Sequence, residues 1–276
     1  MAREIPDARE IRAGRTHLRL DGHVALVSGG GTGIGEAIAR AFARAGAAVA
    51  ISGRRLEVVR AAATTIAAET GREVLAIAGD VARRADCVRM VAETIERFGQ
   101  LDLLVNNAGV SRGGPLGDMT EEAVHLVVDV DLKGPVFLTQ VALPALERSG
   151  EERRASILNI SSSVTFHPVP NFSVYSAAKA GLDMLTRCWA IELAPRRIRV
   201  NAICPGIVRT PVFETMLPPG AIAGHLEHFE QVTPLGRIGT PDDVARLALF
   251  LSSPASEWTT GAVVPVDGGL SLVSEA

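Results

Sequence analysis

Short apolar runs alternate with stretches of helical periodicity along nearly the whole chain. Seven runs predict β-strands, at 23–28, 47–52, 73–80, 101–107, 155–162, 198–206 and 262–269. Amphipathic stretches between them predict helices at about 36–46, 55–70, 84–99, 119–148, 172–194 and 241–252. The first six strands are apolar almost without interruption, which is typical of strands buried on both faces. The alternation predicts a doubly wound α/β fold, in which helices cover both faces of a seven-stranded, mostly parallel sheet.

The pattern predicts one domain at 21–276, because no internal repeat or low-complexity linker divides it. Residues 1–20 are polar and mixed in charge, and we interpret them as an N-terminal arm. The arm lacks the apolar stretch of a secretory signal, and Glu4, Asp7 and Glu10 disfavour a transit peptide.

Composition narrows the class of partner. The net charge is −3 with interspersed signs, which disfavours nucleic acid and anionic membranes as partners. No apolar run is long enough to span a bilayer. Cys87, Cys188 and Cys204 lie far apart without metal-ligand or redox spacing, as expected in a reducing cytoplasm. We therefore predict a cytoplasmic protein that acts on small molecules.

A glycine-rich turn joins the first strand to the first helix. It runs Gly29-Gly30-Gly31-Thr32-Gly33-Ile34-Gly35, with the spacing G-x-x-x-G-x-G. Glycines at such a junction permit a tight turn and close approach of a pyrophosphate to the helix N-terminus. Glycine collects in ordinary turns too, but the position after the first strand favours a nucleotide site.

The end of the second strand bears on the choice of cofactor. A carboxylate there binds the ribose hydroxyls of NAD, whereas arginine accommodates the 2′-phosphate of NADP. This chain has Ser52-Gly53-Arg54-Arg55 and no acid. The sequence favours NADP(H) and leaves NAD(H) possible; the alternative is that both arginines are solvated residues of the next helix.

Tyr175 is the single tyrosine of the chain, and Lys179 is one of two lysines. Residues four apart share a helix face, so the ammonium can approach the phenol. A nearby cation favours phenolate and lowers the pKa of a tyrosine, which suits a proton donor and acceptor near neutral pH. The alternative is an exposed helix pair without chemistry.

Together these motifs resemble the short-chain dehydrogenase/reductase superfamily, over residues 20–270. The matching motifs occur in the order expected for that family: Ser28-Gly29 with Gly33-Ile34-Gly35, Asp80-Val81, Asn106-Asn107-Ala108-Gly109, Asn159-Ile160-Ser161-Ser162, Tyr175 with Lys179, and Pro205-Gly206 with Thr210. The resemblance implies a Rossmann-type domain and hydride transfer between a nicotinamide and a carbonyl or secondary alcohol. It also implies a homo-oligomer, usually a tetramer built on the long helices at 119–148 and 172–194.

The resemblance also implies roles for individual residues. Tyr175 would be the proton donor and acceptor, Lys179 would lower its pKa and hold the nicotinamide ribose, and Ser162 would hold the substrate oxygen. The remaining cofactor contacts would come from the glycine turn (Gly29, Gly31, Thr32, Gly33, Ile34, Gly35), from Ser52, Arg54 and Arg55, from Asp80 and Val81 at the adenine, from Asn107, Ala108 and Gly109, and from Pro205, Gly206, Ile207 and Thr210 near the nicotinamide.

One position departs from the family pattern. The family carries asparagine in a motif like D-V-N-L-x-G, where it supports a proton relay to the lysine. This chain reads Asp129-Val130-Asp131-Leu132-Lys133-Gly134. If the relay uses the backbone carbonyl, Asp131 can serve. If it needs the amide, or if a buried carboxylate perturbs Lys179, activity falls or its pH optimum moves.

The substrate is less readable. Residues 208–232 follow the sixth strand, where this family places a lid. Phe213, Met216 and Leu217 would form its apolar cover, with Val164, His167 and Phe172 on the opposite wall. This arrangement favours a medium-sized, partly apolar ketone, although the same side chains could pack into the body or a subunit contact. His225 and His228 have an H-x-x-H spacing, but no third ligand stands nearby, so we predict no metal.

Three functions remain open at this stage. The first is an NADP(H)-dependent carbonyl reductase or alcohol dehydrogenase, 3-oxoacyl reductases included. The second is a 2-enoyl-thioester reductase of the same superfamily, and the third is an NADP(H)-binding regulator without catalysis. A hydrolase is disfavoured because the chain has no G-x-S-x-G elbow.

Overall fold

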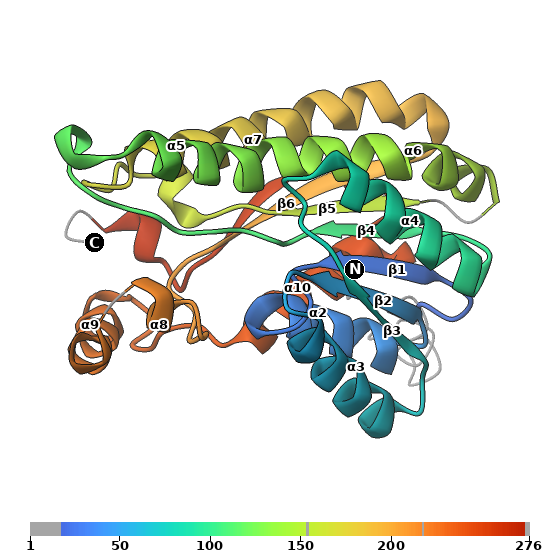
Figure 1. The fold of residues 1–276 in the computed structure, drawn as a ribbon, viewed down its shortest axis with the longest axis horizontal. Helices are drawn as coiled ribbons and strands as arrows, with labels where there is room; N and C mark the ends of the chain where they lie inside the picture. Colours follow the sequence, from blue (N-terminus) through green and yellow to red (C-terminus); the bar gives the residue numbers. More distant parts are fainter. Residues whose placement is uncertain (1–17, 153–154, 217, 274–276) are drawn as a thin grey trace, which may run out of the picture.

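All seven predicted strands are present and pair in parallel in one sheet (Figure 1). The computed structural model describes residues 18–152, 155–216 and 218–273, so residues 1–17 of the predicted arm lie outside the described residues. The strands, in chain order, are β1 Val24–Ser28, β2 Ala48–Gly53, β3 Val74–Ala78, β4 Leu103–Asn106, β5 Ser156–Ile160, β6 Arg199–Pro205 and β7 Val263–Val266. Their spatial order is β3-β2-β1-β4-β5-β6-β7, which confirms the doubly wound fold.

Helices cover both faces of the sheet (Figure 1). One face packs against α2 (Gly33–Arg44), α3 (Leu56–Thr70) and α10 (Pro241–Ser252). The other packs against α4 (Arg84–Phe98), α6 (Gly134–Glu152) and α7 (Ser173–Leu193). Both cores consist mainly of Ala, Val, Leu and Ile, as the low aromatic content requires. Leu20 is fully buried in the first core, so the folded body begins before β1.

The predicted helix at 119–148 is interrupted. It consists of α5 (Glu121–Val128), a π-helical segment η2 (Asp129–Lys133) and α6. In the π segment, Gly134 N–H donates to the carbonyl of Asp129, five residues earlier. Such single-turn π bulges are rare and are frequent at functional sites. Here the bulge lies at the Asp131 position that departs from the family pattern.

The segment after β6 folds into two helices that the sequence did not predict, α8 (Phe213–Met216) and α9 (Pro219–Val232). Phe213, Leu226 and Ile238 form a small apolar cluster within this segment. A parallel bridge between Val208 and Gly239 closes its base. The remaining short elements are the 3-10 helices η1 (Leu116–Asp118), η3 (Ser163–Thr165), η4 (Ala194–Arg196), η5 (Pro254–Ser256) and η6 (Leu270–Leu272).

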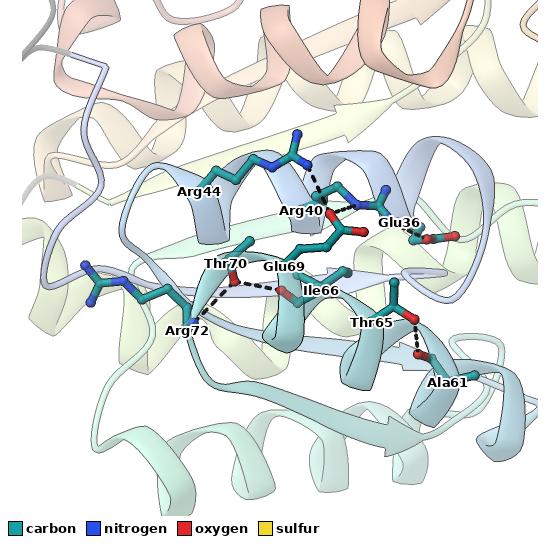
Figure 2. Close-up of polar contacts among 9 residues, drawn as sticks. All are labelled: Glu36, Arg40, Arg44, Ala61, Thr65, Ile66, Glu69, Thr70 and Arg72. Atoms are coloured by element: carbon teal, nitrogen blue, oxygen red, sulfur yellow. Dashed lines mark hydrogen bonds and ion pairs between the residues drawn. The ribbon is translucent and has the colours of Figure 1, made fainter.

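An ion-pair network joins α2 to α3 (Figure 2). Arg40 contacts Glu36 at 2.5 Å and Glu69 at 3.0 Å, and Arg44 also contacts Glu69 at 3.0 Å. A single exposed pair contributes little, but shared carboxylates and guanidinium groups fix geometry better than isolated pairs. The network holds α2, and with it the glycine turn that precedes α2, against the helix that follows β2.

Asp102 stabilises the sheet at the amino-terminal ends of its central strands β1 and β4. Its fully buried carboxylate accepts hydrogen bonds from Val24 N–H at 2.6 Å, Gln100 Nε2 at 2.7 Å and the Ser149 hydroxyl at 2.5 Å. These bonds connect β1, the start of β4 and the end of α6.

Among the described helices, none combines the length and apolar character that a bilayer crossing requires.

We predict that Asp102→Ala lowers the free energy of unfolding by about 2–4 kcal/mol, because it leaves buried donors without an acceptor. Urea denaturation followed by circular dichroism measures the change. The exposed Asp21, which pairs with Arg19, supplies a matched control: Asp21→Ala should leave the free energy of unfolding almost unchanged. Equal stability of the two variants would show that the buried hydrogen bonds of Asp102 do not stabilise the fold.

Candidate active site

The glycine turn approaches the strands so closely that side chains are excluded from it. A Cβ atom on Gly35 would lie 2.3 Å from the carbonyl oxygen of Gly29. Gly29 has a φ of +64°, and its Cβ would lie 2.9 Å from Ala108 Cα. Helix α2 begins at Gly33, so the free N–H groups of its first turn face this edge of the sheet. The turn therefore suits a pyrophosphate, which needs close backbone approach and a helix N-terminus.

Ser28 and Asn107 lock the turn to the end of β4. Asn107 N–H donates to Ser28 Oγ at 3.0 Å, and its side-chain amide donates to the carbonyls of Ser28 at 2.9 Å and Gly29 at 3.1 Å. Ala108 N–H also donates to Ser28 Oγ, at 3.1 Å. The serine hydroxyl thus links the end of β1 to the residues that follow β4. Asn107 shapes the predicted cofactor groove by positioning the backbone around it.

The end of β2 presents groups suited to an adenosine. The Ser52 hydroxyl is buried, and no hydrogen-bond partner for it exists among the described residues. Arg54 and Arg55 are exposed, and neither has an ion pair with a described residue. The neighbouring β3 ends before Asp80 and Val81, where the Asp80 carboxylate accepts from Ala82 N–H at 3.1 Å. An unpaired buried hydroxyl and unpaired guanidinium groups fit a polar ligand that carries phosphate.

The segment after β6 closes against the glycine turn. A Cβ on Gly33 would lie 3.1 Å from Thr210 Cγ2, so Thr210 lies beside the start of α2. Gly206 N–H donates to Val266 at 3.0 Å, and Gly239 N–H donates to the carbonyl of Ile207 at 2.8 Å. These bonds hold 205–210 in place. The structure thus brings together the nucleotide residues predicted from four separate motifs.

Ser162, Tyr175 and Lys179 meet at the carboxyl end of β5. Tyr175 and Lys179 lie on α7, and the ammonium Nζ is 5.7 Å from the centre of the phenol ring. The Ser162 hydroxyl lies close enough to the Tyr175 phenol to affect its pKa, and Ser162 Oγ accepts from Val164 N–H at 3.4 Å. Lys179 is 4% exposed and donates to the carbonyl of Ile160 at 3.0 Å. The alternative of an exposed helix pair is therefore wrong.

Asp131 forms a buried ion pair with Lys179. Its Oδ1 lies 3.0 Å from Nζ, without a well-aligned hydrogen bond, and its Oδ2 accepts from Val110 N–H at 3.1 Å. The π segment directs this carboxylate into the site, and Asp131 is fully buried. Burial raises the pKa of Asp131, and the Lys179 ammonium opposes that rise. The side chain at the position of the family's asparagine thus contacts Lys179 directly.

The net shift of the Tyr175 pKa is opposite to the predicted one. Burial, the largest effect, raises the pKa of the phenol, and the Asp131 carboxylate raises it further. The Lys179 ammonium and the nearby Ser162 hydroxyl lower it, but less. The predicted effect of Lys179 is present, and burial outweighs it. Burial lowers the pKa of Lys179, but the Asp131 carboxylate and its neighbours raise it more, so the ammonium stays protonated.

Asp183 is a buried carboxylate near the site that no sequence motif predicted. This residue lies on α7 four positions after Lys179 and is 5% exposed. Its carboxylate oxygens lie 3.8 and 4.0 Å from the Sγ of Cys204 on β6, whose pKa burial raises to about 12. The spacing of four from Lys179 is the signal that could have identified it.

Only some of the predicted substrate-binding residues lie near Tyr175 and Ser162. Phe172 packs edge-on against Tyr175, with ring centres 6.3 Å apart, and His167 has a buried Nδ1 without a described partner. Phe213 packs inside the cluster of its own segment, which was the alternative left open. Val164 is half-buried in η3, close to Ser162. Met216 ends α8, and Leu217 lies outside the described residues.

The two histidines of the H-x-x-H spacing pack against aromatic rings. His225 lies between Phe213 and Phe229, with ring centres 5.6 and 4.9 Å apart, and His228 contacts Phe229 at 5.3 Å. Burial and the neighbouring His228 lower the pKa of His225. Within the described part of the chain, no three His, Cys, Asp or Glu side chains are grouped to hold a metal ion.

Comparisons with known proteins agree with this arrangement. The family model described as Enoyl-(Acyl carrier protein) reductase matches residues 29–271. The chain is 39% identical to 3-oxoacyl-[acyl-carrier-protein] reductase FabG of Thermotoga maritima, over 92% of this chain and 99% of that protein.

Two solved structures share the fold over nearly their whole length. The 3-ketoacyl-(acyl-carrier-protein) reductase of Brucella melitensis, complexed with NADH, has a TM-score of 0.82 and 36% identity, and covers 91% of this chain and 99% of its own. The gluconate 5-dehydrogenase of Burkholderia cenocepacia, in complex with NADP and tartrate, has a TM-score of 0.85 and 32% identity, over 94% and 98%. The chain therefore belongs to the short-chain dehydrogenase/reductase family of oxidoreductases.

Proposed function

We propose that this oxidoreductase uses NADP(H) to interconvert a ketone and a secondary alcohol, with Tyr175 as the proton donor and acceptor. The observation that carries the proposal is the Ser162–Tyr175 hydroxyl pair beside the buried Lys179, at the edge of the sheet that also holds the glycine turn. Two hydroxyls that converge on one point suit a carbonyl oxygen on which charge develops.

A bound nicotinamide would supply the hydride in this reaction. The chain itself would position both reactants. The glycine turn and the start of α2 would hold the pyrophosphate, Asp80 and Val81 would border the adenine, and 107–109 with 205–210 would line the groove between them. Ser162 would orient the substrate oxygen, and Tyr175 would exchange a proton with it.

NADP(H) is the favoured cofactor because Arg54 and Arg55 follow β2 with no carboxylate beside them. Relatives with either cofactor are known, since the Brucella structure holds NADH and the Burkholderia structure holds NADP. The unpaired guanidinium groups support the phosphorylated form, because each can bind phosphate through two parallel hydrogen bonds.

We predict that Arg54→Ala combined with Arg55→Ala weakens NADPH binding roughly 10- to 100-fold, from the loss of charge-assisted hydrogen bonds worth about 1.5–3 kcal/mol. NADH binding should stay near the wild-type value. Titration of cofactor fluorescence measures both constants, and Arg60→Ala, on the exposed side of α3, is the control. Equal weakening of NADPH and NADH binding would mean that the arginines do not bind the 2′-phosphate.

The substrate is proposed to be an uncharged ketone with an apolar body. Exposed apolar side chains border the carboxyl edge of the sheet in three separate connections, at Leu116, Phe166 and Leu235. Residues 109–128 and 206–239, which follow β4 and β6, carry six carboxylates against three arginines. An anionic surrounding disfavours thioesters whose carrier arms bear phosphate.

We predict that Tyr175→Phe lowers turnover roughly 100- to 10,000-fold, because it removes the proton donor, while NADPH affinity stays near wild type. Absorbance of NADPH follows turnover over a panel of apolar ketones, sugars, 3-oxoacyl thioesters and 2-enoyl thioesters.

Each outcome of this panel discriminates between functions. Turnover of ketones that the variant lacks would support the proposal. Turnover of enoyl thioesters alone would identify a carbon–carbon double-bond reductase, and NADPH binding without turnover on any carbonyl would identify a regulator. A variant with wild-type rates would exclude Tyr175 as the donor.

The outer face of α7 supports a homo-oligomer, and the family resemblance points to a tetramer. Met184, Cys188 and Ile191 are exposed and lie on one stripe of the helix, at a spacing of four and then three residues. Ile191 is 79% exposed, which is unusual for isoleucine. A second copy of the chain would cover this stripe.

We predict that Ile191→Glu lowers the molecular mass in solution, because it places a carboxylate in an apolar contact between copies. Size-exclusion chromatography with light scattering measures the mass. Thr64→Glu, on the exposed side of α3, is the control and should keep the wild-type mass. A wild-type protein that is already monomeric would contradict the proposed oligomer.

A further inference from the structure

One buried carboxylate contacts the single ammonium of the site, and a second lies on the same helix close enough to affect the pKa of that ammonium. Lys179 Nζ lies 3.0 Å from Asp131 Oδ1, and both side chains are at most 5% exposed. Asp183 follows one turn later on the same helix and is also buried. The positive charge that would favour a phenolate at Tyr175 is therefore already matched by two negative charges.

Among the described residues, Lys179 is the cation that pairs with Asp131 and that lowers the pKa values of Asp131 and Tyr175. Strand β5 contributes the Ile160 carbonyl, the connection after β5 contributes the Ser162 hydroxyl, and β6 contributes the Cys204 thiol, which its high pKa keeps neutral. The connection after β4 contributes Gly109 and the Val110 N–H. Ionisation of Tyr175 would thus place a third negative charge in a buried region that holds one positive charge.

The position of Asp131 is fixed from three sides. The π segment turns it inward, Val110 N–H holds Oδ2 at 3.1 Å, and the ammonium holds Oδ1. Gly109 leaves the necessary room, because a Cβ there would lie 2.8 Å from Asp131 Oδ1. A carboxylate so constrained cannot swing away from Lys179 without rebuilding the segment.

We propose that Asp131 is a positioning residue that keeps Lys179 as its own ion-pair partner and, with Asp183, holds Tyr175 as a protonated phenol. The site is thereby biased toward giving a proton to a carbonyl oxygen over taking one from an alcohol. The bias toward carbonyl reduction rests on the proposed function. The protonation state of Tyr175 depends only on the charged groups of the chain itself.

The bias follows from the proton balance of the two directions. Carbonyl reduction adds a hydride, with its two electrons, from the reduced cofactor to the carbonyl carbon, and a proton from Tyr175 Oη to the oxygen. The phenolate then regains a proton from solvent. Alcohol oxidation needs the phenolate first, which the surrounding carboxylates oppose, so this direction should require alkaline pH.

The single tyrosine makes the test direct, because all phenolate absorbance of the protein comes from Tyr175. We predict that the cofactor-free protein develops this absorbance only above pH 10, the ordinary range of tyrosine. Asp131→Asn should move the titration to lower pH, and Asp183→Asn should move it in the same direction. Circular dichroism at each pH confirms that the protein is folded.

Asp129→Asn is the matched control, because Asp129 lies two residues earlier in the same π segment and pairs with Lys133 outside the site. It should titrate like wild type. Lys179→Met should move the titration to higher pH. An unchanged titration of Tyr175 in Asp131→Asn would overturn the proposal. If Asp131→Asn does not fold, the titration of Tyr175 in Asp183→Asn is the test in its place.

Rates in both directions test the bias. With all substrates saturating, Asp131→Asn should raise the ratio of kcat for alcohol oxidation to kcat for ketone reduction near pH 7 by roughly tenfold or more, while Asp129→Asn leaves this ratio unchanged. An unchanged ratio despite a shifted titration would overturn the claimed direction. A shifted titration without turnover in any variant would uphold the charge arrangement and reject the proposed function.

Discussion

Parallel pairing of all seven strands is the constraint on which the site depends. Because the carboxyl ends of all seven strands lie on the same side of the sheet, the connections after β1, β4, β5 and β6 meet there although they are distant in sequence. Ser28 and Asn107, 79 residues apart, share a hydrogen bond for this reason. The same crowding buries polar groups, and two hydrogen bonds of 2.8 Å link Asn106 to Asn159 and Asn159 to Thr186. This buried network holds β4, β5 and α7 in the register that aligns the site.

The ion pair of Lys179 and Asp131 is the costliest feature of this edge. Removing two charges from water costs several kcal/mol, and a buried pair is often no more stable than apolar residues of similar size. Two hydrogen bonds support the pair here, because Lys179 donates to the Ile160 carbonyl and Asp131 accepts from Val110 N–H. Such a pair is weak evidence for stability. Its proximity to the only tyrosine makes a role in proton transfer the better explanation.

The sequence allowed the strands, the glycine turn and the Tyr175–Lys179 pair to be predicted, because each depends on periodicity or spacing within one local segment. The partner of Lys179 could not be predicted in this way. Asp131 reaches it only because a π turn adds a residue to the helix, and apolar periodicity carries no sign of that insertion. The direction of the Tyr175 pKa shift was missed because burial, which no local pattern measures, outweighs the lysine. Helices α8 and α9 were missed because Pro218, Pro219 and Gly220 resemble a turn.

The geometry also bears on whether a carbonyl or a carbon–carbon double bond is reduced. Ketone reduction delivers hydride to carbon and a proton to the adjacent oxygen, so both hydroxyls of a Ser–Tyr pair can act on that one oxygen. Reduction of an enoyl thioester must instead end with a proton on the carbon next to the thioester carbonyl, which a donor held on the oxygen reaches only through an enol. The Ser162 hydroxyl lies close enough to Tyr175 to lower the pKa of its phenol, so both groups can approach a single acceptor. A phenol kept protonated by buried carboxylates suits that acceptor when it is a ketone oxygen, which favours carbonyl reduction although the matching family model is described as an enoyl reductase.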